Sequence, residues 1–449
     1  MKTKPRWYTT AATVLALSLL AAAAQGCSAP RETVTILVAF TPTETTIFKN
    51  EVTKPFNRAN PGVQVNVEST RALAQEITAD QQQGELPQLA ALPSIGALAQ
   101  YKHDRYPLQN LDPVITTSDY GPPWSSFMRL SPHGHAYAVP IKVDVKSLIW
   151  YDPAKSHAQA LASGTWSQLP GATRSGDAAG RAPWCLALSS APTSGWPGTD
   201  WIADIMLNRY PREYRKWAAG RLSWTSGPVR DAWLMWGHLL SSGKSLGELY
   251  GGPGRALTTP VGTKKFNPAS SGCTLAHGAL VDEAFTKSDH YHGDYAFAAP
   301  PAGTPVQVSA DFAVMFKNTS GTAKFMKYMT QPATQRRWVD TEPAPRTAGL
   351  PGTLSADKQV QPGDYPKGVT RDIAKLLFSQ RQLCFGASDS MPPALSEAFD
   401  NAVLDYISAP DTLTSKILPE LERVRQDAEA EEDHVPALHP VCGTPYRNG

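Results

Sequence analysis

The chain has 449 residues, of which 18% are charged, and its formal net charge is only +2. This length exceeds what one hydrophobic core usually holds, so we expect two lobes. A near-neutral balance argues against nucleic acid as a partner, because binding to phosphates requires a strongly basic surface.

The N-terminus has the layout of an export signal. Three basic residues precede a small and apolar run over 11–24, which is too short to span a membrane, and Cys27 follows. This cysteine resembles the acylated cysteine of bacterial lipoproteins, although Ala24 departs from the usual Leu. We therefore predict a signal peptide over 1–26 and a lipid anchor on Cys27 at the outer face of the cytoplasmic membrane. An ordinary secretory signal is the alternative.

Removing residues 1–26 takes away three positive charges and no negative ones, so the formal charge falls from +2 to −1. Four further cysteines follow: Cys185, Cys273, Cys384 and Cys442. An even number in an exported chain predicts two disulfides, and three pairings are possible. We favour Cys185–Cys273 and Cys384–Cys442. No Cys-x-x-Cys pattern is present, so a zinc or redox site is not expected.

The first third of the chain alternates strands and helices. The pattern predicts strand 33–40, a helix from about 43 that Asn60-Pro61-Gly62 ends, strand 63–67, helix 70–83 before Gly84, and strand 86–93. Strands and helices in this order build a parallel sheet covered by helices. Ligands of such sheets bind at the carboxyl ends of the strands, here near 40–41 and 93–94.

The remainder of the chain is mixed. Two strands are predicted over 137–144 and 147–151, and we expect them to cross between the lobes. Residues 198–243 are predicted to be mainly helical. Strands return over 294–300 and 311–316. Helices are then predicted over 321–329, 332–340, 370–381, 393–408 and 411–428, with a Pro- and Gly-rich loop over 344–369.

One short motif indicates the ligand. Gly195-Trp-Pro-Gly-Thr-Asp-Trp201 sets two indoles and a carboxylate within six residues on a turn. Flat apolar faces beside a hydrogen-bond acceptor suit a sugar, whose ring has apolar faces and a rim of hydroxyls. The alternative is that Trp196 and Trp201 are core residues capped by a polar turn.

Taken together, several segments resemble the carbohydrate-binding extracellular solute-binding proteins of ABC importers, in particular the α-glucoside type. The segments that carry this resemblance are 84–93, 136–151, 183–188, 195–201, 271–277 and 387–392. The family implies an α/β, two-lobed periplasmic-binding-protein fold with a hinge of crossing strands and a ligand cleft between the lobes. On this basis we expect an N-lobe over 32–142 and 301–340, a C-lobe over 143–300 and 341–430, and a C-terminal tail over 431–449.

The resemblance also implies the ligand contacts and the partners. The expected ligand-binding residues are Phe40, Thr41, Thr43, Glu44, Pro93 and Ser94 on the N-lobe, Lys142, Asp144 and Asp311 at the crossing strands, and Trp196, Asp200 and Trp201 on the C-lobe. Gln88 departs from the Asp that many relatives have. The expected partners are a sugar and the permease subunits of an importer, with the chain itself a monomer and without a cofactor.

Two other classes stay open from the residues alone. A secreted glycoside hydrolase would need two opposed carboxylates, which Asp144, Asp200 and Asp311 could supply. The order of elements, however, lacks the regular alternation of the commonest hydrolase barrel, and we do not expect an enzyme. The same fold could also bind a glycerophosphodiester, a polyamine or a metal. Neither the His133/His135 pair nor the His290/His292 pair has an evident cysteine or carboxylate cluster that completes a tetrahedral set, although Asp289 and Asp294 lie close to the second pair, and we expect no metal.

Overall fold

The computed structural model describes residues 31–70, 72–101, 108–122, 124–129, 134–151, 153, 184–186, 188, 195–241, 245–246, 249, 275–279, 295–301, 303–339, 353–379, 382–431 and 441–443. The predicted signal peptide, Cys27, Cys273 and the histidines at 133, 290 and 292 lie outside these residues.

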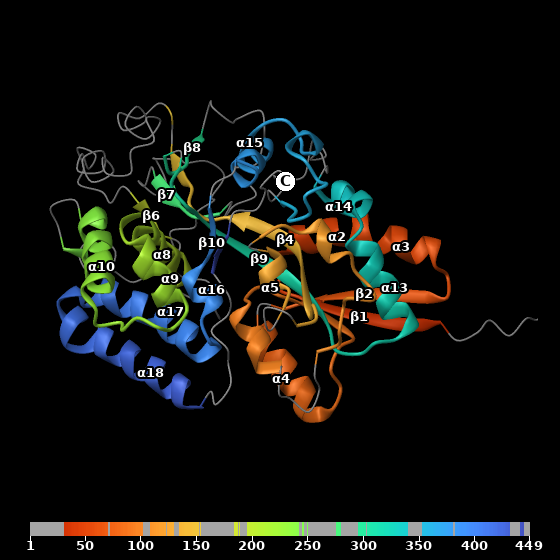
Figure 1. Cartoon of the computed structure of the whole chain (residues 1–449), viewed down its shortest axis with the longest axis horizontal. Helices are drawn as coiled ribbons and strands as arrows, with labels where there is room; N and C mark the ends of the chain where they lie inside the picture. Colours follow the sequence, from red (N-terminus) through yellow and green to blue (C-terminus); the bar gives the residue numbers. More distant parts are fainter. Residues whose placement is uncertain are drawn as a thin grey trace, which may run out of the picture.

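The larger sheet crosses most of the molecule (Figure 1). Its strands are β1 (Glu32–Val38), β2 (Val63–Ser69), β3 (Leu89–Leu92), β4 (Ala138–Val145), β9 (Val306–Met315), β10 (Leu383–Phe385) and β11 (Cys442–Gly443). The strand order is β11-β10-β9-β3-β1-β2, and β4 pairs with β9. Strands β2 and β3 both run parallel to β1, which confirms the predicted parallel opening of the fold.

The helices that accompany this sheet are α2 (Pro42–Phe48), α3 (Lys54–Ala59), α4 (Leu73–Gln83), α5 (Trp124–Phe127), α13 (Ser320–Met329), α14 (Pro332–Val339) and α15 (Val369–Leu377). Helices α3 and α13 lie near β1 and β2, whereas α5 lies beside β4 and β9 (Figure 1). A π-helical turn, Lys49–Thr53, joins α2 to α3, where the sequence predicts one continuous helix. The predicted stop at Asn60 and the end of α4 at Gly84 are both confirmed. Short 3₁₀ turns lie at Gly96–Tyr101, Thr117–Asp119 and Pro362–Asp364.

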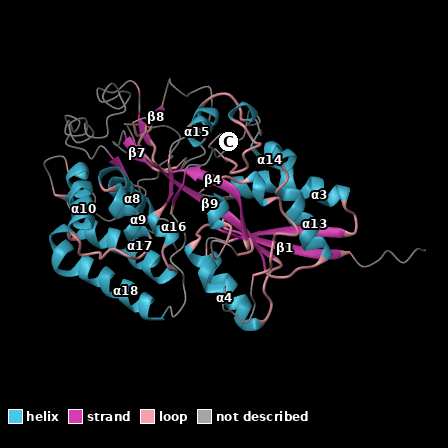
Figure 2. Ribbon diagram, viewed as in Figure 1, coloured by secondary structure: helices cyan, strands magenta, loops and turns pink. Residues whose placement is uncertain are grey.

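The other half of the molecule has a smaller sheet with its own helical layer (Figure 2). Its strands, in the order β6-β7-β5-β8, are Trp184–Cys185, Leu275–His277, Ile149–Tyr151 and Ala296–Ala298. The helices are α8 (Trp196–Arg209), α9 (Pro211–Ala218), α10 (Gly227–Leu240), α16 (Ala387–Ser390), α17 (Pro393–Ser408) and α18 (Leu418–Glu431). The turns Pro410–Thr412 and Leu413–Ile417 connect α17 to α18.

Two hydrophobic cores match these two halves. One contains β1, β2, β3 and the apolar residues of β4 and β9; the other contains α8, α10 and α17. β4 and β9 run antiparallel to each other, and the chain passes through each of them between the two halves. The predicted strand 137–144 corresponds to β4, but the second predicted crossing strand, 147–151, forms β5 of the smaller sheet, and the partner of β4 is β9. Tyr365 and Ile373 pack in the first core although the sequence assigns 341–430 to the second lobe, so the lobe boundaries stay a prediction.

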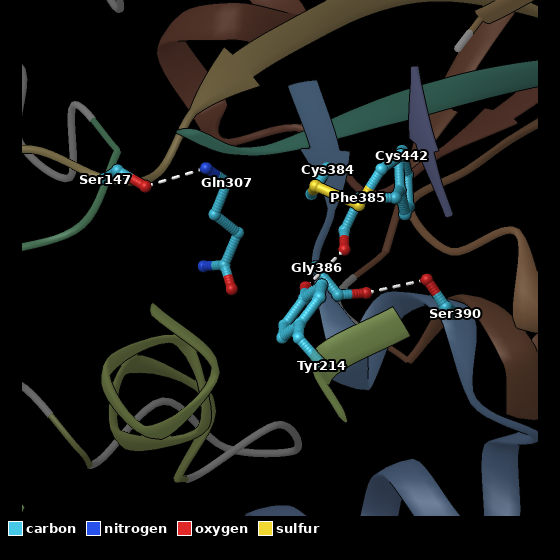
Figure 3. The surroundings of a disulfide bond; sticks show 8 residues. All are labelled: Ser147, Tyr214, Gln307, Cys384, Phe385, Gly386, Ser390 and Cys442. Atoms are coloured by element: carbon cyan, nitrogen blue, oxygen red, sulfur yellow. Dashed lines mark hydrogen bonds between the residues drawn. A yellow bond between two sulfur atoms is a disulfide. The ribbon is translucent and has the colours of Figure 1, made fainter. Parts of the chain in front are cut away.

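A disulfide holds the C-terminal segment on the sheet. Cys384 of β10 and Cys442 of β11 lie opposite each other and are bonded, as predicted (Figure 3). The predicted partner of Cys185 is outside the described residues, so that pairing stays a prediction. Strands β10 and β11 were not predicted, because strands of two or three residues form only when a longer strand, here β9, offers its edge.

Candidate functional site: a polar strip on the crossing strands

One face of the ladder formed by β4 and β9 is polar, and the other is apolar. Side chains alternate between the two faces of a strand, and Ile141, Val143 and Val145 are fully or almost fully buried. The polar residues that alternate with them, together with their counterparts on β9, form what we call the hinge strip. Its members are Lys142, Asp144, Lys146, Gln307, Ser309 and Asp311.

At one end of the hinge strip, a single lysine is surrounded by three carboxylates. Lys142 Nζ lies 2.6 Å from Glu44 Oε1 and 3.5 Å from both Asp144 Oδ2 and Asp311 Oδ2. The four side chains are largely buried, and Asp144 is the most exposed at 22%. One positive charge therefore faces three groups that are negative when all of them are ionised.

Burial and these charges shift the pKa values in opposite directions. Burial raises the pKa of Asp311 to about 7 despite Lys142, and burial also raises that of Asp144. Burial acts against the charge of Glu44 as well, but Lys142 and the backbone N–H of Thr41 outweigh it and lower the pKa of this carboxyl. Burial opposes the charge of Lys142, yet the three carboxylates hold its pKa well above its ordinary value.

The start of α2 explains why Glu44 can reach Lys142. Thr41 is the N-cap residue: its side chain accepts a hydrogen bond from Glu44 N, and Glu44 Oε2 accepts one from Thr41 N at 2.8 Å. This reciprocal capping box satisfies two free N–H groups at the helix start. It also fixes the Glu44 carboxylate, so that its other oxygen is available to the lysine.

At the other end of the hinge strip, Lys146 lies between two carboxylates. Its Nζ is 2.8 Å from both Asp200 Oδ1 and Asp389 Oδ2, and it lies 6.0 Å from the ring centre of Trp196. Burial raises the pKa of Asp200 to about 6, and burial together with Asp200 and Asp389 raises that of Asp400 to about 8. Among the described residues, Asp200 Oδ2 is buried and has no hydrogen-bond partner.

Helix α8 presents Trp196 and Asp200 to Lys146 because the two residues lie on the same face of the helix. Trp196, Asp200 and Asp204 follow each other at intervals of four residues, which places them in one row along the helix. Trp196 is half-buried at the start of this row, whereas Asp200 and Asp204 are buried beneath it. The row faces the residues of β4 and β9 and those directly after β4.

The last residue of this row, Asp204, belongs to a buried network that links the two halves. Asp204 Oδ1 accepts a hydrogen bond from Ser147 Oγ at 2.6 Å, and its Oδ2 lies 2.9 Å from His277 Nε2. Ser147 Oγ in turn accepts a hydrogen bond from Gln307 N at 2.7 Å (Figure 3). The aspartate stands between the serine and the histidine, which is not the order of a hydrolytic relay, where histidine contacts the serine.

The remaining predicted site residues are placed as follows. Phe40 is buried against Phe48 and Trp338, with ring centres 5.6 and 5.8 Å away. Pro93 is exposed, Thr43 is half-buried, and Ser94 Oγ donates to Asp389 O at 2.6 Å.

Trp201 differs from Trp196. It is only 2% exposed, with its ring edge-to-face on Trp184 at 4.7 Å and stacked on His277 at 4.0 Å. Gln88, the residue that departs from the pattern of many relatives, accepts a hydrogen bond from Thr35 N at 2.7 Å and so binds the backbone of β1.

Sequence reasoning missed Lys146, Asp389 and Asp400 as members of the site. The signal for Lys146 was its spacing of two from Asp144 and of four from Lys142, which places all three on one strand face. Asp389 lies in the segment 387–392, whose resemblance to the family was noted but not used for the site. No local pattern distinguishes Asp400, which belongs to the long helix α17.

Comparison with known proteins decides the family. Residues 41–336 match the model of the bacterial extracellular solute-binding protein family. The chain belongs to this family. It is therefore a solute-binding protein rather than an enzyme. The carboxylates around the hinge strip accordingly have no catalytic role.

Two relatives of this solute-binding protein carry names that describe their ligands. The osmoprotective compounds-binding protein GgtB of Synechocystis is 28% identical over 382 residues, covering 82% of this chain and 87% of the relative. The alpha-glucosides-binding periplasmic protein AglE of Rhizobium meliloti is 27% identical over 369 residues and covers 77% of each chain.

Solved structures confirm the two-lobed α/β fold of this solute-binding protein. The sugar-binding protein MalE of Xanthomonas citri superimposes with a TM-score of 0.61 at 13% identity, covering 90% of this chain and 100% of that chain. Within the described residues, no helix combines the length and apolar character needed to cross a membrane. The same residues contain no cluster of three or more His, Cys, Asp or Glu able to hold a metal ion.

Proposed function

We propose that this solute-binding protein captures a carbohydrate on the hinge strip by closure of its two lobes, and that it delivers the sugar to the permease of an ABC importer. The observation that carries the proposal is the hinge strip itself. Carboxylates from both halves meet on the crossing strands beside the half-buried indole of Trp196. Carboxylates accept charge-assisted hydrogen bonds from hydroxyls, and an indole face packs on the apolar face of a sugar ring.

The ligand class is supported by the charge of the strip. Both lysines already contact two or three carboxylates each, so the strip and its partners carry more acidic than basic groups. A phosphodiester or another anion would be repelled there, since like charges brought together disfavour binding. A neutral polyol presents donors without a charge, and the name of the relative AglE, which binds alpha-glucosides, agrees with such a ligand. An α-glucoside-type oligosaccharide is therefore our proposed substrate.

Closure follows from the position of the strip. The N-lobe wall would be Thr41, Thr43, Glu44 and Ser94, and the C-lobe wall would be Trp196, Asp200 and Asp389. The bond from Ser94 Oγ to Asp389 O joins the residues on either side of the strip. A ligand that contacts both walls binds the closed form better, and it shifts the equilibrium only by that difference in affinity. Phe40 and Trp201 would support the two walls from behind, because both are buried.

The proposed place of the protein in the cell rests on its N-terminus. Cleavage before Cys27 and acylation of its thiol would hold the protein at the outer face of the cytoplasmic membrane, where a permease can receive the closed form. Two acyl chains anchor a protein stably without any membrane-spanning helix, whereas a single chain binds the membrane only reversibly. Mass spectrometry of the protein from a membrane fraction tests this point, because acylation adds a mass that a Cys27→Ser variant cannot carry.

The decisive experiment for the ligand is calorimetric titration with α- and β-linked di- and trisaccharides. A matching sugar should bind with a dissociation constant on the order of 1 μM, equivalent to about 8 kcal/mol. Replacing Asp144 by Asn retains the shape of the side chain but removes the charge-assisted acceptor, and it should weaken binding by roughly tenfold or more.

The matched control is Leu234→Ala, which removes an exposed apolar side chain on α10 away from the strip. This variant should bind the sugar like the wild type. If no sugar in the panel releases or absorbs heat, or if Leu234→Ala and Asp144→Asn lose affinity equally, the assignment of the hinge strip as a sugar site is wrong.

A further inference from the structure

A second site of different character lies on α9, away from the hinge strip. A surface hollow of about 550 Å³ is lined by four basic residues and one acidic residue. Its lining is Arg212, Glu213, Arg215, Lys216, Ala219, Arg221 and Val441. Hollows of this volume fall within the range that holds small ligands.

The local fold concentrates the four positive charges. Arg212, Arg215 and Lys216 follow at intervals of three and four residues, so they share one face of α9, while Tyr214 and Trp217 are buried on the other. The helix ends at a turn through Gly220, whose φ is +69°, and Arg221 N donates to Lys216 O at 2.7 Å. This turn returns Arg221 to the face that already carries the other three.

Helix stability does not account for this arrangement. Arg215 and Lys216 lie in the last turn, where cations interact favourably with the helix dipole, but Arg212 lies in the first turn, where the dipole opposes a cation. Like charges three or four residues apart also repel each other. In the part of the chain that the structure describes, no ion pair joins any of these four cations to a carboxylate.

In the part of the chain that the structure describes, the neighbouring carboxylates of α18 are engaged elsewhere. Glu422 and Glu429 both pair with Arg425, which donates to Gly220 O beside the hollow. Among the lining residues, Glu213 is acidic and four are basic, so three of the four cations are left in excess.

We infer that this hollow binds a phosphate group. Guanidinium groups match phosphate oxygens with paired, charge-assisted hydrogen bonds, and three arginines with a lysine can contact several oxygens at once. This site is separate from the sugar site: the hinge strip is acidic, whereas the hollow is basic. A phosphate could reach it either as a free phosphate compound or as the headgroup of a phospholipid.

Calorimetric titrations of the purified full-length protein at low ionic strength would test the inference with two soluble probes. Inorganic pyrophosphate represents a free phosphate compound, and glycerophosphoglycerol represents a lipid headgroup. Binding of pyrophosphate alone identifies a free phosphate as the ligand, and binding of glycerophosphoglycerol identifies a headgroup; either outcome supports a phosphate site. No heat with either probe would overturn the proposal.

Three variants show whether binding occurs in the hollow. Arg212→Gln and Arg221→Gln, both at exposed positions, should each weaken binding roughly tenfold, since a hydrogen bond to a charged group typically contributes that factor. Glu213→Gln should strengthen binding, because it removes the one carboxylate of the lining. The control is Arg230→Gln on α10, which removes an exposed arginine that does not line the hollow. Equal weakening in the control would mean that the net charge of the protein, not the hollow, attracts the phosphate.

Discussion

Lys142 of β4 lies opposite Asp311 of β9, with its Nζ 3.5 Å from Asp311 Oδ2. The pair joins the two crossing strands at one end of the hinge strip. Glu44 and Asp144 contact the same lysine, so the single positive charge of Lys142 cannot balance an ionised Asp311 as well. The ionisation of Asp311 therefore connects the stability of the hinge to pH.

The first prediction concerns this pH dependence. The pKa of Asp311 is about 7 in the folded chain against an ordinary 3.8, so the folded form retains a proton that the unfolded form has lost. Between these values the folded state binds more protons, and the free energy of unfolding falls as pH rises. Asp200, with a pKa of about 6, acts in the same direction. Replacing Asp311 by Asn should stabilise the protein by about 1–2 kcal/mol at pH 8 and change little at pH 5.

Urea unfolding at both pH values measures this effect. The control is Asp411→Asn, at an exposed position in the turn after α17, which should leave the pH dependence as in the wild type. A wild-type protein that gains stability from pH 5 to pH 8, by an amount that Asp311→Asn leaves unchanged, would contradict this account.

The second prediction concerns Lys146 at the other end of the strip. A Lys146→Met variant retains the aliphatic part of the side chain but leaves Asp200 and Asp389 without their cation. Breaking a buried ion pair in this way typically costs about 3–5 kcal/mol. Thermal unfolding at pH 8 should show this loss, with a smaller loss at pH 5, where Asp200 takes up a proton.

Lys375→Met is the comparison for that variant, because Lys375 forms an exposed ion pair with Asp372 on α15. It should cost less than about 1 kcal/mol. Similar losses in the two variants would mean that the burial of Lys146 makes no difference to its contribution.

The third prediction separates the two tryptophans of α8. Trp201 is packed on Trp184 and His277, so Trp201→Ala should destabilise the fold by about 3–5 kcal/mol. Trp196 is half-buried at the helix start, so Trp196→Ala should cost less stability but abolish measurable sugar binding. Paired measurement of the melting temperature and of sugar affinity checks both. The interpretation is wrong if Trp196→Ala is the more destabilised variant or binds sugar like the wild type.

The fourth prediction concerns the disulfide. Cys384 and Cys442 are 58 residues apart, and closing a loop of this length restricts the unfolded chain by about 4 kcal/mol in the chain-entropy description. A Cys384→Ala/Cys442→Ala variant should therefore unfold at lower denaturant concentration while retaining sugar affinity, because neither cysteine belongs to the hinge strip. Loss of sugar affinity in a variant that still folds would contradict this prediction and would show that the disulfide is required for the geometry of the hinge strip.

The fifth prediction concerns Gly195, which begins α8. Its φ is +106°, and a Cβ added there would lie 2.0 Å from the backbone oxygen of Asp400. Gly220 also has a positive φ but open space around it. Gly220→Ala therefore measures the backbone strain alone, about 1 kcal/mol, whereas Gly195→Ala adds the collision with α17 and should cost several times more. Equal losses in urea unfolding would show that α17 moves aside at no cost.

Periodicity along the chain was sufficient to predict the types and order of the main elements. Helix α17 begins and ends where the sequence predicts, and the parallel opening and the first of the crossing strands, β4, are also predicted. The alternation of polar and apolar residues over 142–146 also predicts which face of β4 is polar. These features depend on contacts between residues that are close in sequence, and local spacing records such contacts directly.

Tertiary structure decided which of these residues form the site. Lys146 meets Asp200 and Asp389, which lie 54 and 243 residues away, and no local pattern records such distances. The motif around Trp196 and Trp201 contained both indoles, but only the packing of α8 on β7 and the crossing strands buried one and left the other partly open. The short strand β10 likewise forms on the edge of β9, and β11 forms on β10, to which a disulfide joins it. Spacing in the sequence determines which side chains share a face of a helix or strand. The residues that this face contacts come from distant parts of the chain, and bringing them together requires the closure of long loops, which local spacing does not record.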